Sequence, residues 1–144
     1  MSGISRIAGL LLLLVLLILL VRGDLRSRSP WIILGQVASL LLMISARRSF
    51  HAGQFRVTPA PSGRGPLLTR GPYRSIRHPM YAGALLLLWS SVLGHWSVVN
   101  ASLALVASAA VVVRINDEEY ALRAHFPDYA EYSRRTKRLV PYIW

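Results

Sequence analysis

Four long runs of hydrophobic residues divide the chain, and each run is bounded by charged residues, glycine or proline. The runs cover residues 7–21, 31–46, 79–94 and 97–113. Their apolar residues are nearly continuous and are not confined to one helical face, as is typical of helices surrounded by lipid. Each run approaches the roughly 20 residues that cross a hydrocarbon core of about 30 Å. The pattern therefore predicts four transmembrane helices, at about residues 5–22, 31–47, 79–94 and 97–114.

The connections between these runs predict how the helices are joined. Only Gly94, His95 and Trp96 separate the third run from the fourth, so these two helices are expected to form an antiparallel hairpin. The connection over residues 47–77 is rich in proline and glycine, which disfavours regular helix. Because long structureless connections in compact proteins are usually functional, we expect this one to form an ordered cap over the cytoplasmic end of the bundle.

The fourth run continues into a charged segment. Leu122, Phe126 and Tyr129 give that segment an apolar stripe at helical spacing, and Pro127 interrupts it. The pattern predicts a cytoplasmic extension of the fourth helix followed by a second short helix. The expected fold is all-α and polytopic, with residues 1–144 forming a single membrane domain.

Composition supports a membrane protein and excludes several kinds of site. Hydrophobic residues make up 53% of the chain, and the mean hydropathy is +0.42. Cysteine is absent, which excludes disulfides and thiolate metal sites, and scattered histidines make a metal site improbable. The first run follows Arg6 as a signal peptide would, but no small-x-small cleavage site follows it, so we expect a retained span. The sequence also lacks glycine-rich dinucleotide and P-loop motifs.

The formal charge of +11 is explained by topology better than by nucleic acid binding. No acidic residue lies between Leu25 and Asn116, and further basic residues follow the fourth run. The positive-inside rule then places both the long connection and the C-terminus in the cytoplasm, and four spans place the N-terminus there too. We expect a bacterial inner membrane protein whose basic face attracts anionic lipid. The long connection carries a set of arginines: Arg47, Arg48, Arg56, Arg64, Arg70, Arg74 and Arg77.

The start of the third run, GPYRSIRHPMYAG, places polar residues directly at the membrane edge. Pro79 suits the first helical position, so His78 is expected at the N-cap. The free backbone amides that follow, with Arg74 and Arg77 nearby, would suit a carboxylate or phosphate. Alternatively, the arginines only determine topology, His78 is a fortuitous cap and Tyr81 is an interfacial aromatic residue.

Arg114 and Glu118 lie four residues apart at the end of the fourth run. They could form a local ion pair of modest strength. Because the third and fourth helices form a hairpin, they could instead face His78 and Tyr81 across one cavity. Polar groups at this depth are costly in a membrane and are usually functional.

Three sequence elements together identify a family. The elements are R-H-P-x-Y-x-G from Arg77, R-x-x-x-E-E from Arg114 and F-x-x-Y-x-x-Y from Phe126. In this order and spacing, over about residues 56–143, they resemble the integral-membrane methyltransferases that include isoprenylcysteine carboxyl methyltransferase and the phospholipid N-methyltransferases. The resemblance implies S-adenosylmethionine as the methyl donor, bound at the cytoplasmic end of the bundle.

The resemblance also implies roles for individual residues. Arg114 and Glu118 would be catalytic, with Arg114 in contact with the acceptor. The favoured acceptor is lipophilic and carries a carboxylate, as in an isoprenylcysteine; the alternative is a phospholipid amine, for which Glu118 or Tyr81 would help to remove a proton. More distant alternatives are an NADPH-dependent membrane reductase of the sterol type and a non-enzymatic scaffold. The donor-binding residues would be Gly65, Pro66, Leu67, Leu68, Tyr73, His78, Met80, Tyr81 and Glu118.

Overall fold

The computed structural model describes residues 3–23, 25, 27–50 and 67–141. In this part of the chain the elements are α1 (Gly3–Val21), α2 (Pro30–Arg48), the short 3-10 helix η1 (Gly71–Arg74), α3 (Pro79–Gly94), α4 (Val98–His125) and α5 (Tyr129–Arg135). The predicted all-α class is confirmed for the described residues, which add one isolated bridge between Ile76 and Lys137. Most of the predicted cap falls on residues 51–66, which lie outside the described residues.

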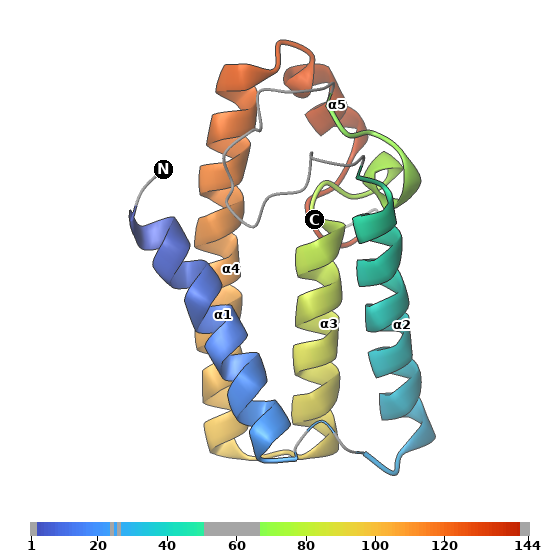
Figure 1. Cartoon of the computed structure of the whole chain (residues 1–144), viewed down its shortest axis with the longest axis vertical. Helices are drawn as coiled ribbons and strands as arrows, with labels where there is room; N and C mark the ends of the chain where they lie inside the picture. Colours follow the sequence, from blue (N-terminus) through green and yellow to red (C-terminus); the bar gives the residue numbers. More distant parts are fainter. Residues whose placement is uncertain (1–2, 24, 26, 51–66, 142–144) are drawn as a thin grey trace.

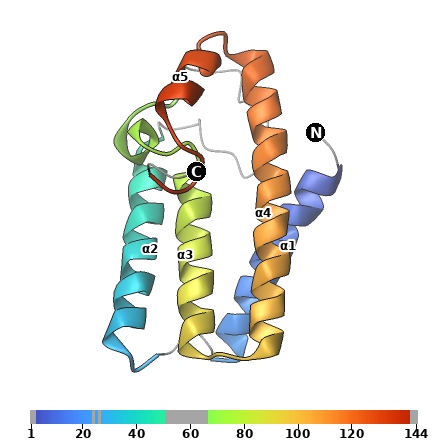
Figure 2. The ribbon, with the colours of Figure 1, turned by 180° about the vertical axis from the view of Figure 1, so that it is seen from behind.

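The four long helices form a bundle in which consecutive helices alternate in direction (Figure 1). The closest pairings are α2 with α3 and α1 with α4, and α1 crosses α4 obliquely. The opposite view shows the same arrangement, with η1, α5 and the end of α4 gathered at one end of the bundle (Figure 2). The first turn of α1 lies at that end too, so that end brings together segments from most of the chain.

Local sequence explains where the later helices begin and end. The predicted hairpin is confirmed: α3 ends at Gly94, and Ser97 caps α4 by accepting a hydrogen bond from the Asn100 amide at 3.0 Å. The predicted extension is confirmed as well, because α4 continues to His125, and α5 begins two residues after Pro127.

Small residues allow α2 and α3 to pack closely. A Cβ added at Gly35 would lie 2.6 Å from Oγ of Ser90, and one added at Gly83 would lie 3.0 Å from the carbonyl oxygen of Ser39. Such contacts are typical of helices that associate in lipid, where close backbone approach replaces the hydrophobic effect. Glycine at these two positions therefore allows the close approach of α2 and α3.

The apolar core lies mainly between α1, α3 and α4. One polar contact accompanies it, because the indole nitrogen of Trp89 donates to Oγ of Ser108 at 3.1 Å. The buried hydrophobic residues of this core are Leu12, Val15, Leu19, Ala84, Leu88, Val92, Ala104, Ala107, Val111, Ile115 and Leu139.

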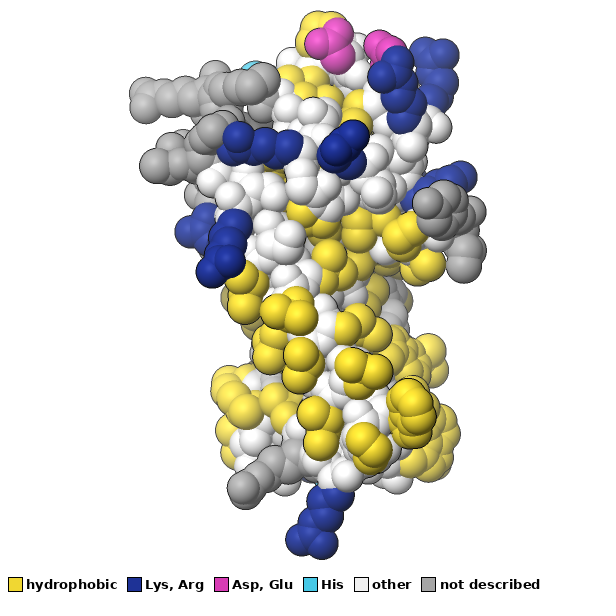
Figure 3. Space-filling model, turned by 90° about the vertical axis from the view of Figure 1, so that its right-hand side faces the viewer, with side chains coloured by type: hydrophobic (Ala, Val, Ile, Leu, Met, Phe, Trp, Pro, Cys, Tyr) yellow, Lys and Arg dark blue, Asp and Glu magenta, His cyan; other side chains and the backbone are white. Residues whose placement is uncertain are grey.

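Much of the outer surface is apolar as well. Leu13 and Leu17 of α1 and Leu41 of α2 are each more than half exposed. Figure 3 shows hydrophobic side chains over the lower part of one face and charged side chains toward the end with α5. Helices α2 and α4 are long and apolar enough to cross a membrane, while the apolar part of α1 (Arg6–Val21) and α3 are shorter. Water-soluble monomers rarely expose apolar surface so extensively.

Candidate active site

Polar side chains from α3 and α4 meet where the hydrophobic part of the bundle ends. His78 occupies the N-cap of α3, with Pro79 at the first helical position, as the sequence predicted. The His78 side chain forms no cap hydrogen bond to the helix. It points instead toward α4, whose buried charged residues include Arg114 and Glu119. Because burying a charge without a partner is costly, these groups need partners close by.

Tyr81 joins the two charged residues that α4 carries one turn apart. Nε of Arg114 donates a hydrogen bond to the Tyr81 hydroxyl group, which in turn donates to Oε1 of Glu118 at 2.8 Å. The guanidinium carbon of Arg114 also lies 5.9 Å from the centre of the Tyr81 ring. Cation, phenol and carboxylate therefore form a chain of contacts between α4 and the first turn of α3.

His78 lies between two carboxylates. Its Nδ1 is 3.4 Å from Oε2 of Glu118, and its Nε2 is 3.4 Å from Oε1 of Glu119. Burial alone would lower the pKa of His78, but hydrogen bonds to Glu118 and Glu119 and their negative charges outweigh burial and raise it. The arrangement therefore favours the protonated, cationic form of the imidazole.

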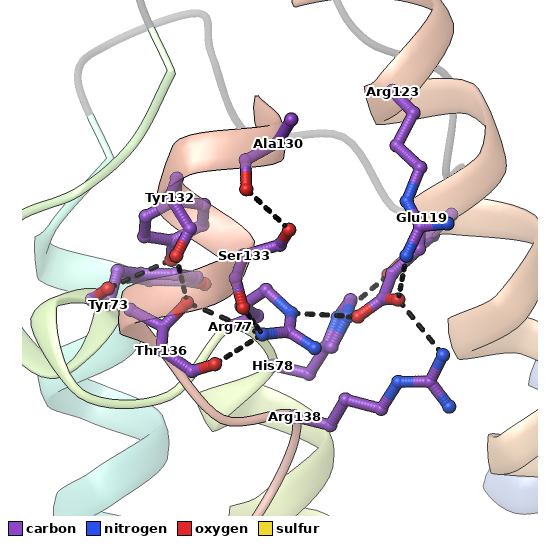
Figure 4. A network of polar contacts seen from close by, with 11 residues as sticks. Tyr73, Arg77, His78, Glu119, Arg123, Ala130, Tyr132, Ser133, Thr136 and Arg138 are labelled. Atoms are coloured by element: carbon purple, nitrogen blue, oxygen red, sulfur yellow. Dashed lines mark hydrogen bonds and ion pairs between the residues drawn. The ribbon is translucent and has the colours of Figure 1, made fainter. Parts of the chain in front are cut away.

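Glu119 is a buried carboxylate with several cationic partners, and the sequence analysis did not single it out. Its oxygens lie 2.8 Å from Nε of Arg77 and 3.1 Å from Nη2 of Arg138 (Figure 4). Burial would raise the pKa of Glu119, but the hydrogen bonds from His78 and Arg77 and the charge of Arg138 lower it to about 2. The second glutamate of the R-x-x-x-E-E element was the available signal for this role.

Arg77 therefore has a different partner from the one expected. The sequence suggested that it contributes to an anion site at the start of α3, but its guanidinium binds Glu119 and the carbonyl oxygens of Ser133, at 2.9 Å, and Thr136. Figure 4 shows it between α4 and α5. Arg77 thus links α4 and α5 to the residues that directly precede α3. Arg74, by contrast, is exposed.

Backbone hydrogen bonds also fix the residues that directly precede α3. The amide of Arg77 donates to the carbonyl oxygen of Lys137 at 2.7 Å, and the amide of His78 donates to that of Arg138 at 3.0 Å. The Tyr132 hydroxyl group donates to the carbonyl oxygen of Tyr73 at 2.8 Å. The segment after α5 therefore fixes the position of the His78 backbone.

The structure describes four of the other residues implied as donor-binding: Leu67, Leu68, Tyr73 and Met80. Tyr73 is buried, and burial raises its pKa, as does the negative charge of Glu118. Leu67, Leu68 and Met80 are half-buried and apolar, so their side chains take no part in the hydrogen bonds. Gly65 and Pro66 lie outside the described residues.

Gly9 of α1 is a further contact that the sequence analysis missed. A Cβ added at Gly9 would lie 2.2 Å from Nη1 of Arg114 and 2.9 Å from its Cζ. The Arg114 guanidinium thus rests against the backbone of α1 on one side and bonds Tyr81 of α3 on the other. Gly9 is the one glycine of the first hydrophobic run, and that isolation was its only signal.

Comparison with known proteins identifies the family. The family model described as "Phospholipid methyltransferase" matches residues 30–128, which include α2, η1, α3 and the whole of α4. The chain belongs to this family. His78, Tyr81, Arg114 and Glu118 lie within the matched part, whereas Gly9 precedes it and Arg138, which accepts the hydrogen bond of the His78 amide, follows it.

Two curated proteins are similar to this family member. Over 119 residues it is 34% identical to protein-S-isoprenylcysteine O-methyltransferase B of Arabidopsis thaliana. The matched region covers 78% of the chain and 56% of that protein. Over 76 residues it is 39% identical to the cobalt-zinc-cadmium resistance protein CzcN of Cupriavidus metallidurans, covering 52% of the chain and 35% of that protein. The chain thus spans about a third to just over half of these relatives. No solved structure matches it significantly.

Family membership and the apolar helices together indicate a membrane protein, and the family suggests methyltransferase activity. The family does not distinguish a phospholipid acceptor from an isoprenylcysteine acceptor.

Proposed function

We propose that this protein transfers a methyl group from S-adenosylmethionine to a lipophilic acceptor. The observation that carries the proposal is the chain of contacts from Arg114 through Tyr81 to Glu118, with His78 on the same carboxylate. These residues belong to the two elements most typical of the methyltransferase family that the sequence resembles. The family match also favours methyl transfer over the reductase and scaffold alternatives.

The proposed setting is a bacterial inner membrane that all four long helices cross. The apolar parts of α1 and α3 are shorter than those of α2 and α4, and flanking arginine and tryptophan side chains would compensate by reaching the interfaces. The positive-inside rule orients the end that carries η1 and α5 toward the cytoplasm, together with both termini. A polar donor would then approach the cluster from the cytoplasm, and a lipophilic acceptor would approach it from the bilayer.

The chemistry of the cluster fits the donor. Because the His78 side chain forms no cap, the amides of Met80 and Tyr81 are available to the donor's carboxylate, and the positive end of the helix dipole favours that charge. The next amide, of Ala82, already donates to the carbonyl oxygen of His78 at 3.0 Å. Glu118 can accept a hydrogen bond from an amino or ribose hydroxyl group, or attract a sulfonium. S-adenosylmethionine, when bound, supplies an electrophilic methyl group. Residues 65–68, Tyr73 and Met80 would complete the donor site.

Arg114 favours a carboxylate acceptor. A guanidinium matches the geometry of a carboxylate and can hold it with two parallel hydrogen bonds, and a carboxylate acceptor has no proton to lose. The protein then needs mainly to orient the reactants and exclude water. An isoprenylcysteine-like substrate is therefore the favoured acceptor, in keeping with the relative from Arabidopsis thaliana.

A phospholipid amine is the second candidate acceptor. It is supported by the family description and by the hydrogen bond from Tyr81 to Glu118, since this pair could accept the proton that an amine must lose.

The experiment is to incubate membranes that contain the full chain with methyl-labelled S-adenosylmethionine and to test the labelled product with base. Label released as methanol would indicate a carboxyl methyl ester, whereas label that resists base in the lipid fraction would indicate an N-methylated phospholipid. Arg114→Lys serves as the probe of acceptor binding, because it keeps the charge but removes the fork of donors. Absence of label from every lipophilic fraction would contradict the proposal.

A further inference from the structure

A cavity of about 490 Å³ lies at the charged end of α2, beside the turn that precedes η1. Its wall includes Arg48 and Ser49 from the end of α2 and Arg70 and Gly71 from the turn. The cavity is separate from the candidate active site, because it is lined by none of the site residues His78, Tyr81, Arg114, Glu118 and Glu119. Its chemistry can therefore be considered independently of methyl transfer.

The turn is built onto the end of α2. Nε of Arg70 donates to the carbonyl oxygen of Ser49 at 3.1 Å. Gly71 has a positive φ of 59°, and a Cβ there would lie 2.3 Å from Oγ of Ser49, so the turn requires glycine both for its conformation and for its close approach. Phe50 adds an edge contact to Tyr73 of η1, with ring centres 5.7 Å apart. The wall of the cavity is consequently fixed by contacts that need no ligand.

The lining changes from basic to apolar along α2. Arg48 and Arg70 supply two guanidinium groups, and none of the described residues that line the cavity is acidic. Nε of Arg70 donates to the Ser49 carbonyl oxygen, but a guanidinium carries four further N–H groups that can bind an anion. About one and two turns deeper along α2, Ile44 and Leu41 line the same cavity, and these residues are 48% and 61% exposed. A ligand that matches this lining has an anionic head and an apolar body.

We propose that this cavity binds an anionic phospholipid from the bilayer. The phosphate lies against Arg48 and Arg70, because guanidinium groups bind phosphate oxygens through paired hydrogen bonds. The upper part of an acyl chain lies along Leu41 and Ile44 on the exposed face of α2. Basic residues at a membrane surface are attracted to anionic lipid in any case, and the cavity adds a defined place for one headgroup.

The competing explanation is that these arginines serve only topology and the helix dipole. Arg48 lies in the last turn of α2, where a positive charge offsets the negative end of the helix dipole. That explanation predicts weak, unsaturable attraction that is shared by every basic residue at this end of the protein. The proposal predicts saturable binding that depends on two arginines in particular.

The test is native mass spectrometry of the full chain, purified in detergent and titrated with phosphatidylglycerol or phosphatidylcholine. The expected result is one saturable phosphatidylglycerol adduct, with at least tenfold weaker binding of phosphatidylcholine. Arg48→Gln and Arg70→Gln should each weaken phosphatidylglycerol binding by about fivefold, the effect of one basic residue near a lipid surface. The matched control is Arg74→Gln, which removes an exposed arginine of η1 outside the cavity and should change binding less than twofold.

Two further arms distinguish a lipid from a free anion. Ile44→Ser keeps both arginines and should also weaken phosphatidylglycerol binding, whereas millimolar inorganic phosphate should not displace the lipid. Equal losses in Arg48→Gln and Arg74→Gln, displacement by inorganic phosphate, or an unchanged affinity in Ile44→Ser would each overturn the proposal. Because Arg48 makes no contribution to the fixed turn between Arg70 and Ser49, its variant separates lipid binding from loss of structure.

Discussion

Substitution of Gly9 by alanine tests whether α1 sets the position of Arg114. The new Cβ would lie 2.2 Å from Nη1 of Arg114, whereas ordinary contacts begin near 3.4 Å, so the guanidinium must move by about 1 Å. The Arg114 side chain is long and can give way, so the helices need not separate. Alanine also has a higher helix propensity than glycine, by about 1 kcal/mol. The stability of the protein should therefore change little.

Activity should respond much more strongly than stability. Displacement of the guanidinium breaks the hydrogen bond from Arg114 Nε to the Tyr81 hydroxyl group, and a hydrogen bond to a charged group contributes about 1.5–3 kcal/mol. If Arg114 orients the acceptor, that loss corresponds to a roughly 10- to 100-fold decrease in kcat/KM. The assay is methyl transfer from labelled S-adenosylmethionine, with the melting temperature measured on the same preparation.

Gly35→Ala is the matched control. It adds the same methyl group to another closely packed helical glycine, where the nearest atom is Oγ of Ser90 at 2.6 Å, far from the active-site cluster. It should leave kcat/KM within about twofold of wild type, the scatter expected of a distant substitution. In an Arg114→Ala background, Gly9→Ala should cause no further loss. A further loss there, or equal losses in the two alanine variants, would refute the reasoning.

Three further predictions concern the same end of the bundle. Glu119→Gln should destabilise the protein by about 3–5 kcal/mol in thermal or denaturant unfolding, because it leaves buried cations without their carboxylate; Glu131→Gln, an exposed control, should cost less than about 1 kcal/mol. Tyr81→Phe keeps the ring but removes the hydroxyl group that contacts Arg114 and Glu118, so kcat/KM should fall about 10-fold or more, and the melting temperature should fall as well because buried Arg114 loses this partner. The melting temperature should be highest between about pH 4.5 and 6.5. The stabilisation from the raised pKa of His78 is complete below about pH 6.5 and is lost at higher pH. The stabilisation from the lowered pKa of Glu119 is complete above about pH 4.5 and is lost as the pH falls toward 2. His78→Gln should flatten the alkaline side of this profile, and an unchanged alkaline side would contradict the pairing.

The ends of the helices could be predicted from sequence because their causes are local. Pro79 sets the first turn of α3, Gly94 ends it, and Pro127 follows the end of α4. Hydrophobic runs and helix breakers act within a few residues, so no tertiary contact is needed to interpret them. For the same reason the hairpin of α3 and α4 correctly brought Tyr81 opposite Arg114 and Glu118.

The partners of the charged residues could not be predicted in this way. Glu118 and Glu119 are adjacent, but successive helical residues point about 100° apart, and only the packing of α4 determines which carboxylate faces Arg77. The contact between Gly9 and Arg114 depends on how α1 crosses α4, and hydrophobic runs this uniform carry little information about crossing. These tertiary relations account for the two positions that the sequence analysis missed.

Equilibrium binding of labelled S-adenosylmethionine to the purified full chain tests the central claim most directly. The account predicts saturable binding, with an affinity on the order of micromolar, that NADPH does not displace. Glu118→Gln and His78→Ala should weaken this binding by tenfold or more, whereas Arg114→Lys should leave it nearly unchanged because that residue is assigned to the acceptor. Binding of equal strength in wild type, Glu118→Gln and His78→Ala would contradict the assignment of the donor site to this cluster.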